Sequence, residues 1–139
     1  MPAKKYQKYV KSHDIEIGSS GFEKIQFVGD RDFESNFSVM YLPVTKPNIM
    51  EKFPHSHDFD MYLTFMGLNP NGTRELGGEI VFYLGKEQEE YVFTKPTSFY
   101  IPKGFVHCPL NFRRIDSPIL LIHATLAGEY IPGKAVEIK

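Results

Sequence analysis

The sequence predicts an all-β protein, and three features of its composition and pattern support this class. Twelve Phe and eight Tyr residues favour strands, because aromatic side chains pack well on a pleated surface. Ten Pro and eleven Gly residues supply the many turns that short strands need. Several short segments alternate apolar and polar residues, and none repeats the helical period over a useful length. We therefore expect an antiparallel barrel or double sheet.

The first predicted strands are residues 22–28 and 37–44. Residues 22–28 alternate in polarity between flanking glycines, which is typical of a half-buried strand. The second strand contains Pro43, which marks its edge or its end. Residues 45–53 follow as a predicted loop that leads into a polar, histidine-containing segment.

The second half of the chain holds most of the predicted strands. They are residues 61–66, 79–84, 89–93, 97–101, 106–110 and 119–126. A polar Lys-Glu-Gln turn joins residues 79–84 to residues 89–93, so this pair is predicted to be a hairpin. About eight or nine strands are enough for a barrel or jelly roll, in which few strand edges stay open.

The 139 residues correspond to one domain with a short N-terminal extension. Residues 1–14 carry lysines and tyrosines with little apolar periodicity, so we predict a solvated arm or an edge strand on a neighbour. Residues 15–139 are predicted to form a single β-barrel domain, which is long enough to bury a core without disulfides.

The charge and cysteine content argue against several classes of partner. A formal net charge of -1 gives no field that would attract nucleic acid or an anionic membrane. No apolar run approaches the ~20 residues of a membrane span, and no apolar stretch follows the basic N-terminus as in a secretory signal. The single cysteine rules out an internal disulfide framework. A cytoplasmic protein is the expectation.

His55 and His57 lie one residue apart, and the polar segment around them predicts a metal site. In an extended strand this spacing puts both imidazoles on one face, where they can bind the same ion. Asp60 is the candidate carboxylate ligand and Asp58 the alternative, while His107 supplies a third imidazole after a tight Pro-Lys-Gly turn. The sequence thus offers a mixed nitrogen and oxygen ligand set.

These segments resemble the two sequence motifs of the cupin family. The first motif is matched at His55, His57, Asp60 and Gly67, and the second at Pro102, Gly104, His107 and Asn111. Asp60 stands where the family usually has a glutamate, and one residue closer to the second histidine. The resemblance covers roughly residues 37–126 and implies a cupin-type jelly roll, or antiparallel double-stranded β-helix, with a metal ion inside.

The resemblance also implies a cofactor and a class of activity. The cofactor would be one divalent transition metal ion, either Fe, Mn, Ni, Zn or Cu, because the ligand set suits all of them. Three imidazoles and a carboxylate leave open positions on a six-coordinate ion, as in catalytic sites. We expect a metal-dependent, oxygenase-like enzyme, in particular a dioxygenase, that acts on a small organic molecule. A redox-neutral isomerase or lyase and a non-catalytic ligand-binding or metal-binding cupin are the alternatives.

Three side chains are the candidate catalytic groups, namely Tyr62, Tyr100 and His123. Each lies in a predicted strand and would serve as a proton donor or acceptor if it faced the pocket, but each could also be a core residue. Tyr83 is a further tyrosine of the same kind. Cys108 follows His107 directly, so strand alternation predicts that it faces away from the ion as a small buried side chain.

The predicted strands at residues 22–28 and 37–42 have apolar side chains on both faces. A strand with only one buried face needs apolar side chains on that face alone. We therefore expect the second apolar face to pack against a partner or under the arm. We predict a two-fold homodimer in which residues 1–14 contribute to the interface.

Overall fold

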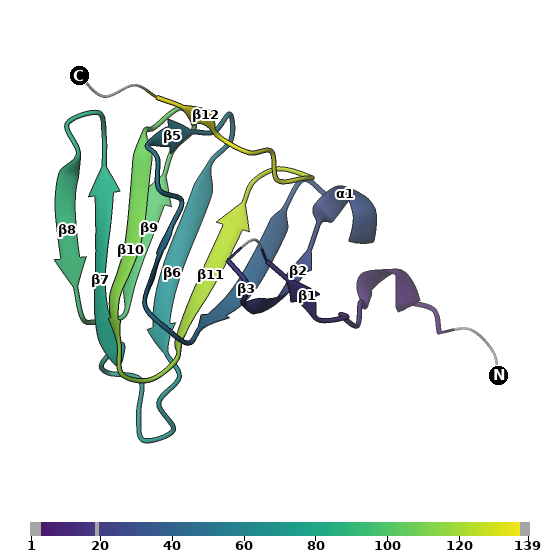
Figure 1. The fold of residues 1–139 in the computed structure, drawn as a ribbon. Helices are drawn as coiled ribbons and strands as arrows, with labels where there is room; N and C mark the ends of the chain where they lie inside the picture. Colours follow the sequence, from purple (N-terminus) through teal and green to yellow (C-terminus); the bar gives the residue numbers. More distant parts are fainter. Residues whose placement is uncertain (1–3, 19, 137–139) are drawn as a thin grey trace.

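The computed structural model describes residues 4–18 and 20–136, and it consists of two antiparallel sheets with the core between them (Figure 1). One sheet has the order β1-β2-β3-β11-β6-β9, and the other has the order β12-β5-β10-β7-β8, with β4 also paired to β10. The strands are β1 (Glu16–Ile17), β2 (Glu23–Phe27), β3 (Ser38–Val44), β4 (Asn48–Met50), β5 (His55–Ser56), β6 (Met61–Gly67), β7 (Gly78–Leu84), β8 (Glu89–Phe93), β9 (Thr97–Ile101), β10 (His107–Ile115), β11 (Ile119–Thr125) and β12 (Lys134–Ala135).

The predicted all-β class is confirmed, and the described strand pairs are antiparallel. The predicted hairpin is β7 and β8, with Val81 opposite Val92. The prediction of a loop at residues 45–53 is wrong in part, because β4 lies inside it and pairs Met50 with Leu110 of β10. The two helical turns, η1 (Gln7–Tyr9) and α1 (Gly29–Asp32), were not predicted. None of the described residues forms a helix long and apolar enough to cross a membrane.

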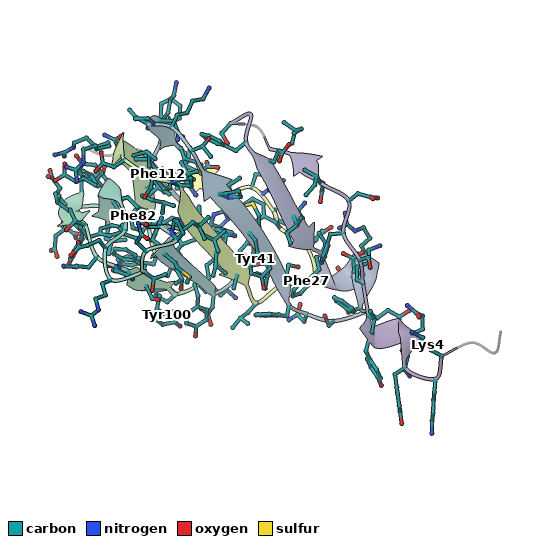
Figure 2. The ribbon with its side chains drawn as sticks, turned by 90° about the horizontal axis from the view of Figure 1, so that it is seen from below. Lys4, Phe27, Tyr41, Phe82, Tyr100 and Phe112 are labelled. Atoms are coloured by element: carbon teal, nitrogen blue, oxygen red, sulfur yellow. The ribbon has the colours of Figure 1, made fainter. Side chains whose placement is uncertain are left out.

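Alternation along β6 separates the core from the outer surface. Met61, Leu63 and Phe65 are buried, whereas Tyr62 and Met66 between and after them are exposed. Phe65 packs against aromatic rings from both sheets. Together these rings form the densely packed half of the core. The rings in this cluster are those of Phe65, Phe82, Phe93, Phe99 and Phe112. Figure 2 shows Phe82 and Phe112 within the densely packed half of the molecule.

The N-terminal segment projects away from the sheets, as Lys4 does in Figure 2. Its contact with the body includes an ion pair of 3.5 Å between Lys11 and Asp32 of α1. The Asp32 carboxylate is buried, accepts the Val28 N–H at 2.9 Å, and pairs with Arg31. The hydrogen bond from Arg31 lowers the pKa of Asp32 well below its usual range. The described part of the arm is therefore fastened at its base and exposed beyond it.

Candidate metal centre

A cavity of about 470 Å³ lies between the sheets, beside the aromatic cluster. The inward side chains of β11 show the change from packed core to cavity. Thr125, His123 and Leu121 line the cavity, whereas Ile119 is fully buried in the core. At the cavity end of the double sheet, the strands carry histidines and short apolar side chains. At the other end, they carry bulky aromatic rings. The walls are mostly apolar, and the lining also includes the charged or amide side chains of Lys24, Gln26, Glu51 and Glu129.

His55, His57 and His107 come together in this cavity. β5 carries His55, which pairs directly with His107 at the start of β10, and His57 follows one residue after β5. The ring centroids are 4.5 Å apart for His55 and His107, and 4.8 Å apart for His55 and His57. All three rings are buried, with His107 only 1% exposed. The structure therefore brings together the three predicted histidines, which are separated by up to half the domain in sequence.

Each of these rings has one nitrogen fixed by the backbone. The Nδ1 atoms of His55, His57 and His107 lie 2.9, 3.0 and 2.9 Å from the carbonyl oxygens of Phe53, Ile131 and Phe105, respectively. A carbonyl only accepts hydrogen bonds, so each Nδ1 carries the proton and each Nε2 keeps a free lone pair. This is the arrangement in which histidines bind metal ions, with one ring nitrogen held and the other bound.

Burial keeps the rings of His57 and His107 in the neutral form. It lowers the pKa of His107 to about 4, with smaller contributions from the neighbouring His55 and His57, against the opposing effect of the Phe105 carbonyl. Burial also lowers the pKa of His57. At neutral pH both rings are unprotonated, which is the form that binds a metal ion without first releasing a proton.

Asp60, the predicted carboxylate ligand, does not line the cavity. Its Oδ1 accepts the backbone N–H of Lys103 at 2.7 Å and so fixes the turn before His107. The physical reason is strand alternation: Met61, one residue later, is buried and lines the cavity. Because neighbouring residues in a strand face opposite sides, Asp60 points away from the cavity that Met61 faces. The prediction that Asp60 is a metal ligand is therefore corrected. Asp58, the alternative, is exposed and pairs with Lys103 at 3.3 Å.

Cys108 lines the cavity, and the prediction that it faces away from the site is wrong. Between His107 and Leu110, β10 has one more residue than its partner β7, so the ladder is irregular there. Cys108 has a φ of +81°, a conformation that side chains rarely adopt. Such a bulge changes the direction of a side chain, and here it places the sulfur beside the histidines. Burial raises the pKa of the Cys108 thiol.

Tyr62 and Tyr100, two of the candidate catalytic groups, lie on the outer face of the sheet, so they neither face the cavity nor belong to the core. They are 45% and 53% exposed, and their rings stack on each other at 5.0 Å across β6 and β9. Alternation explains this position, because the neighbouring Met61 and Ile101 face the core. Figure 2 places Tyr100 at the edge of the molecule. Tyr83 likewise lies outside the cavity lining, near Glu90.

His123 does line the cavity, and it is accompanied by a tyrosine that the sequence did not indicate. The ring of Tyr130 lies 5.4 Å from that of His123, and its hydroxyl donates to Nε2 of His57 at 3.4 Å. Burial lowers the pKa of His123 to about 4 and raises the pKa of Tyr130. Tyr130 was missed because it follows the last long strand, in a segment rich in Gly and Pro with no periodic pattern.

The segment that carries Tyr130 covers the histidines, and we call residues 128–136 the C-terminal strap. The Ile131 carbonyl accepts from His57, and Ala135 in β12 pairs with His55. Gly133 lies so close to His55 that an added Cβ atom would be 2.3 Å from the Cδ2 atom of the ring. The strap therefore determines where two of the histidine rings lie.

No protein-family model and no curated protein matches this sequence. Among solved structures, the polyketide cyclase RemF from Streptomyces resistomycificus matches with a TM-score of 0.60 and 13% identity, over 100% of this chain and 88% of that one. Peruvianin-I, a cysteine peptidase from Thevetia peruviana latex, matches with a TM-score of 0.60 and 12% identity, over 98% and 82% of the two chains.

Bacillus subtilis oxalate decarboxylase, described with Mn(II) centres, matches with a TM-score of 0.54 and 11% identity. That match covers 83% of this chain but only 28% of the decarboxylase. At such low identities the likenesses show a shared fold and leave the chemistry to be argued from the residues themselves.

Proposed function

Because the chain has the cupin fold, we propose that it is a metal-dependent enzyme in which one divalent transition metal ion is bound by His55, His57 and His107. The substrate would be a small organic molecule, and the leading reaction class is oxygenase-like. The observation that carries the proposal is the set of three neighbouring imidazoles, each with Nδ1 tied to a carbonyl and Nε2 left as a donor.

The cavity suits a ligand that is largely apolar with a polar end. Its volume of about 470 Å³ is within the range of sites for small molecules. Met40, Leu42 and Leu121 give apolar walls, while Lys24 and Gln26 are available for a polar or anionic group. Such walls exclude water from the ion, which strengthens the electrostatic interactions inside the site.

The bound ion would supply Lewis acidity and, for iron, manganese or copper, a redox couple. The protein supplies a proton donor. The hydroxyl of Tyr130 lies 3.4 Å from a ligand nitrogen, and the ring of His123 lies beside it. A molecule bound next to the ion would therefore meet a phenol backed by a neutral imidazole, which together can hold or move one proton.

This pair favours a second candidate function. A redox-neutral isomerase or lyase needs a proton donor and acceptor beside the metal, and Tyr130 with His123 fits that need. The names of two structural neighbours, a decarboxylase and a cyclase, are consistent with such chemistry. The two candidate functions differ in whether dioxygen binds to the metal ion. Nitric oxide, an analogue of dioxygen, can test this binding in the Fe(II) form of the protein. An electron paramagnetic resonance signal of an iron–nitrosyl complex supports the oxygenase, and its absence supports the redox-neutral enzyme.

Elemental analysis of the purified protein, prepared with and without air, tests the metal site. We expect about one transition metal ion per chain, or uptake of one on titration. Replacing a ligand should cost at least the ~10-fold in affinity that even outer-shell partners contribute, so His57→Ala should bind far more weakly. His13→Ala is the matched control, because His13 lies outside the cavity lining, and it should bind as the wild type does.

Metal should also stabilise the folded chain. An ion at 100 times its dissociation constant adds roughly 2.7 kcal/mol, so a chelator should lower the Tm measurably. Protein that is isolated metal-free, takes up none of the five metals on titration and melts identically with chelator would contradict the proposal.

A further inference from the structure

The structure brings a sulfur atom to the place where a fourth protein ligand would bind. Donor atoms of His55, His107 and Cys108 all lie within 4.8 Å of one another. The three residues are buried, with exposed fractions of 7%, 1% and 3%. The Nδ1 atoms of both histidines are held by carbonyls, so their lone pairs are on the nitrogens that remain. His57 does not belong to this close group but lies next to it, with its ring centroid 4.8 Å from that of His55 and 5.3 Å from that of His107.

The carboxylates near the site are less well placed. Asp60 is engaged with the backbone of the Pro-Lys-Gly turn and lies outside the cavity lining. Asp58 is exposed on the surface beside Lys103. Glu51 and Glu129 do line the cavity, but both are exposed residues and neither belongs to the close group of donor atoms. The buried fourth donor beside the three imidazoles is therefore a thiol.

We propose that Cys108 is the fourth protein ligand of the metal ion, so that the centre has three imidazoles and one thiolate. This inference rests on the proposed metal site. When the ion binds, the S–H bond breaks, the sulfur lone pair forms the metal–sulfur bond, and the thiol proton is released to the solvent. No electron is transferred in this step.

A thiolate ligand changes which metals the site prefers. Sulfur and imidazole donors suit Zn(II), Co(II) and copper, whereas Mn(II) prefers carboxylate, carbonyl and water oxygens. The proposed ligand set should therefore bind Zn(II) or Co(II) more tightly than Mn(II). Replacing the sulfur by a hydroxyl should reduce this preference, because a hydroxyl is a harder donor than a thiolate.

Cobalt is the most direct probe of the proposed bond. The full chain, freed of metal, is titrated with Co(II) and monitored for sulfur-to-cobalt charge-transfer absorption in the near ultraviolet. Because the chain contains one cysteine, thiolate absorption can only arise from Cys108. We expect the band in the wild type and its loss in Cys108→Ser, which should still bind Co(II) but at least ~10-fold more weakly.

Two matched variants test the competing carboxylates. Asp60→Asn and Glu51→Gln should keep both the band and the affinity of the wild type. Loss of Co(II) affinity in Glu51→Gln, with no band in the wild type, would identify the glutamate as the ligand and overturn the proposal for Cys108.

Other outcomes separate the two proposals. Wild-type protein that binds Co(II) without the band overturns the thiolate ligand but keeps the histidine site. Wild-type protein that binds no Co(II), Zn(II) or other ion overturns both. If Cys108→Ser does not fold, X-ray absorption of the wild-type zinc form decides the question, because a sulfur at about 2.3 Å is distinct from nitrogen at about 2.0–2.1 Å.

Discussion

His123 shows how position alone can change the chemistry of a side chain. It lies on the inward face of β11, and burial lowers its pKa from 6.5 to about 4. In the unfolded chain the ring takes up a proton near pH 6.5, but in the folded chain it does so only near pH 4. The stability due to neutral His123 is therefore fully present above pH 6.5 and is lost as the pH falls toward 4.

This gives a prediction for the metal-free protein. Between pH 7 and pH 5 the shift of His123 lowers the free energy of unfolding by at most about 2 kcal/mol, and less where water in the cavity screens the ring. His123→Gln should remove this part of the pH dependence, as measured by urea unfolding at both pH values. His13→Gln, on the arm, should keep the pH dependence of the wild type. If the free energy of unfolding changes equally with pH in all three proteins, His123 is not the cause of the pH dependence.

Predictability differed among the site residues for physical reasons. The three histidines could be found because the segments around them resemble the two cupin motifs; the spacing of His55 and His57 alone would also suit two polar surface residues. The predicted directions of the Asp60 and Cys108 side chains depended on the strand register being correct to a single residue. Asp60 lies one position before an inward residue, and the bulge at Cys108 reverses the expected face. Tyr130 reaches the site through a non-periodic segment, so nothing local in the sequence indicated it.

At the scale of elements, most long strands were predictable and the shortest were not. The longest strand, β10, was predicted only as residues 106–110, whereas it continues to Ile115. β3, β6, β7 and β11 have seven residues each, long enough for a run of apolar residues to be recognised. β5 and β12 have two residues each and form through pairing with segments distant in sequence. These short strands position His55, so part of the site depends on tertiary contacts that no local pattern encodes.

The strap offers a test of this positioning at Gly133. An alanine Cβ there would come within 2.3 Å of the His55 ring, which must move because such contacts do not occur in folded proteins. Gly133→Ala should therefore weaken Zn(II) binding, measured by calorimetry. Gly18→Ala is the control, since its Cβ would meet its neighbours at an ordinary 3.7 Å. Equal affinities in the two variants would show that the strap does not determine the position of His55.

At the scale of the whole molecule, the exposed N-terminal segment bears on assembly. Tyr6, Tyr9 and Val10 of the arm are between 61% and 65% exposed, and Ile15 and Ile17, where the arm joins the sheet, are 59% and 66% exposed. So many large apolar side chains on one projecting segment are unusual in a monomer. The homodimer stays a prediction, as do the cytoplasmic location and the lack of a nucleic-acid partner. In the dimer we expect the arm to lie on the partner's sheet, where it buries these side chains.

Sedimentation equilibrium of the full chain and of a chain that begins at Ile15 tests this expectation. The full chain should sediment as a dimer, and the shortened chain should dissociate at higher concentration because it loses apolar contact area. If both the full and the shortened chain sediment as monomers, the dimer is refuted. If both form dimers of equal strength, the arm has no role in the interface. The double sheet itself was predictable at this scale, because composition and turn content are global properties.

In the proposed metal site, the strap would link the C-terminal segment to the rate at which metal enters and leaves. Ile131 orients His57, and β12 is held to His55 by a two-residue ladder that is short enough to open often. Each opening would free His57 from the Ile131 carbonyl and His55 from its pairing with Ala135, so in the proposed metal site we expect the ion to exchange through the open form. By linkage, a bound ion would make opening less favourable by the same free energy that closure of the strap adds to ion binding. The half-life of the bound ion and the resistance of the C-terminus to carboxypeptidase digestion should thus rise and fall together.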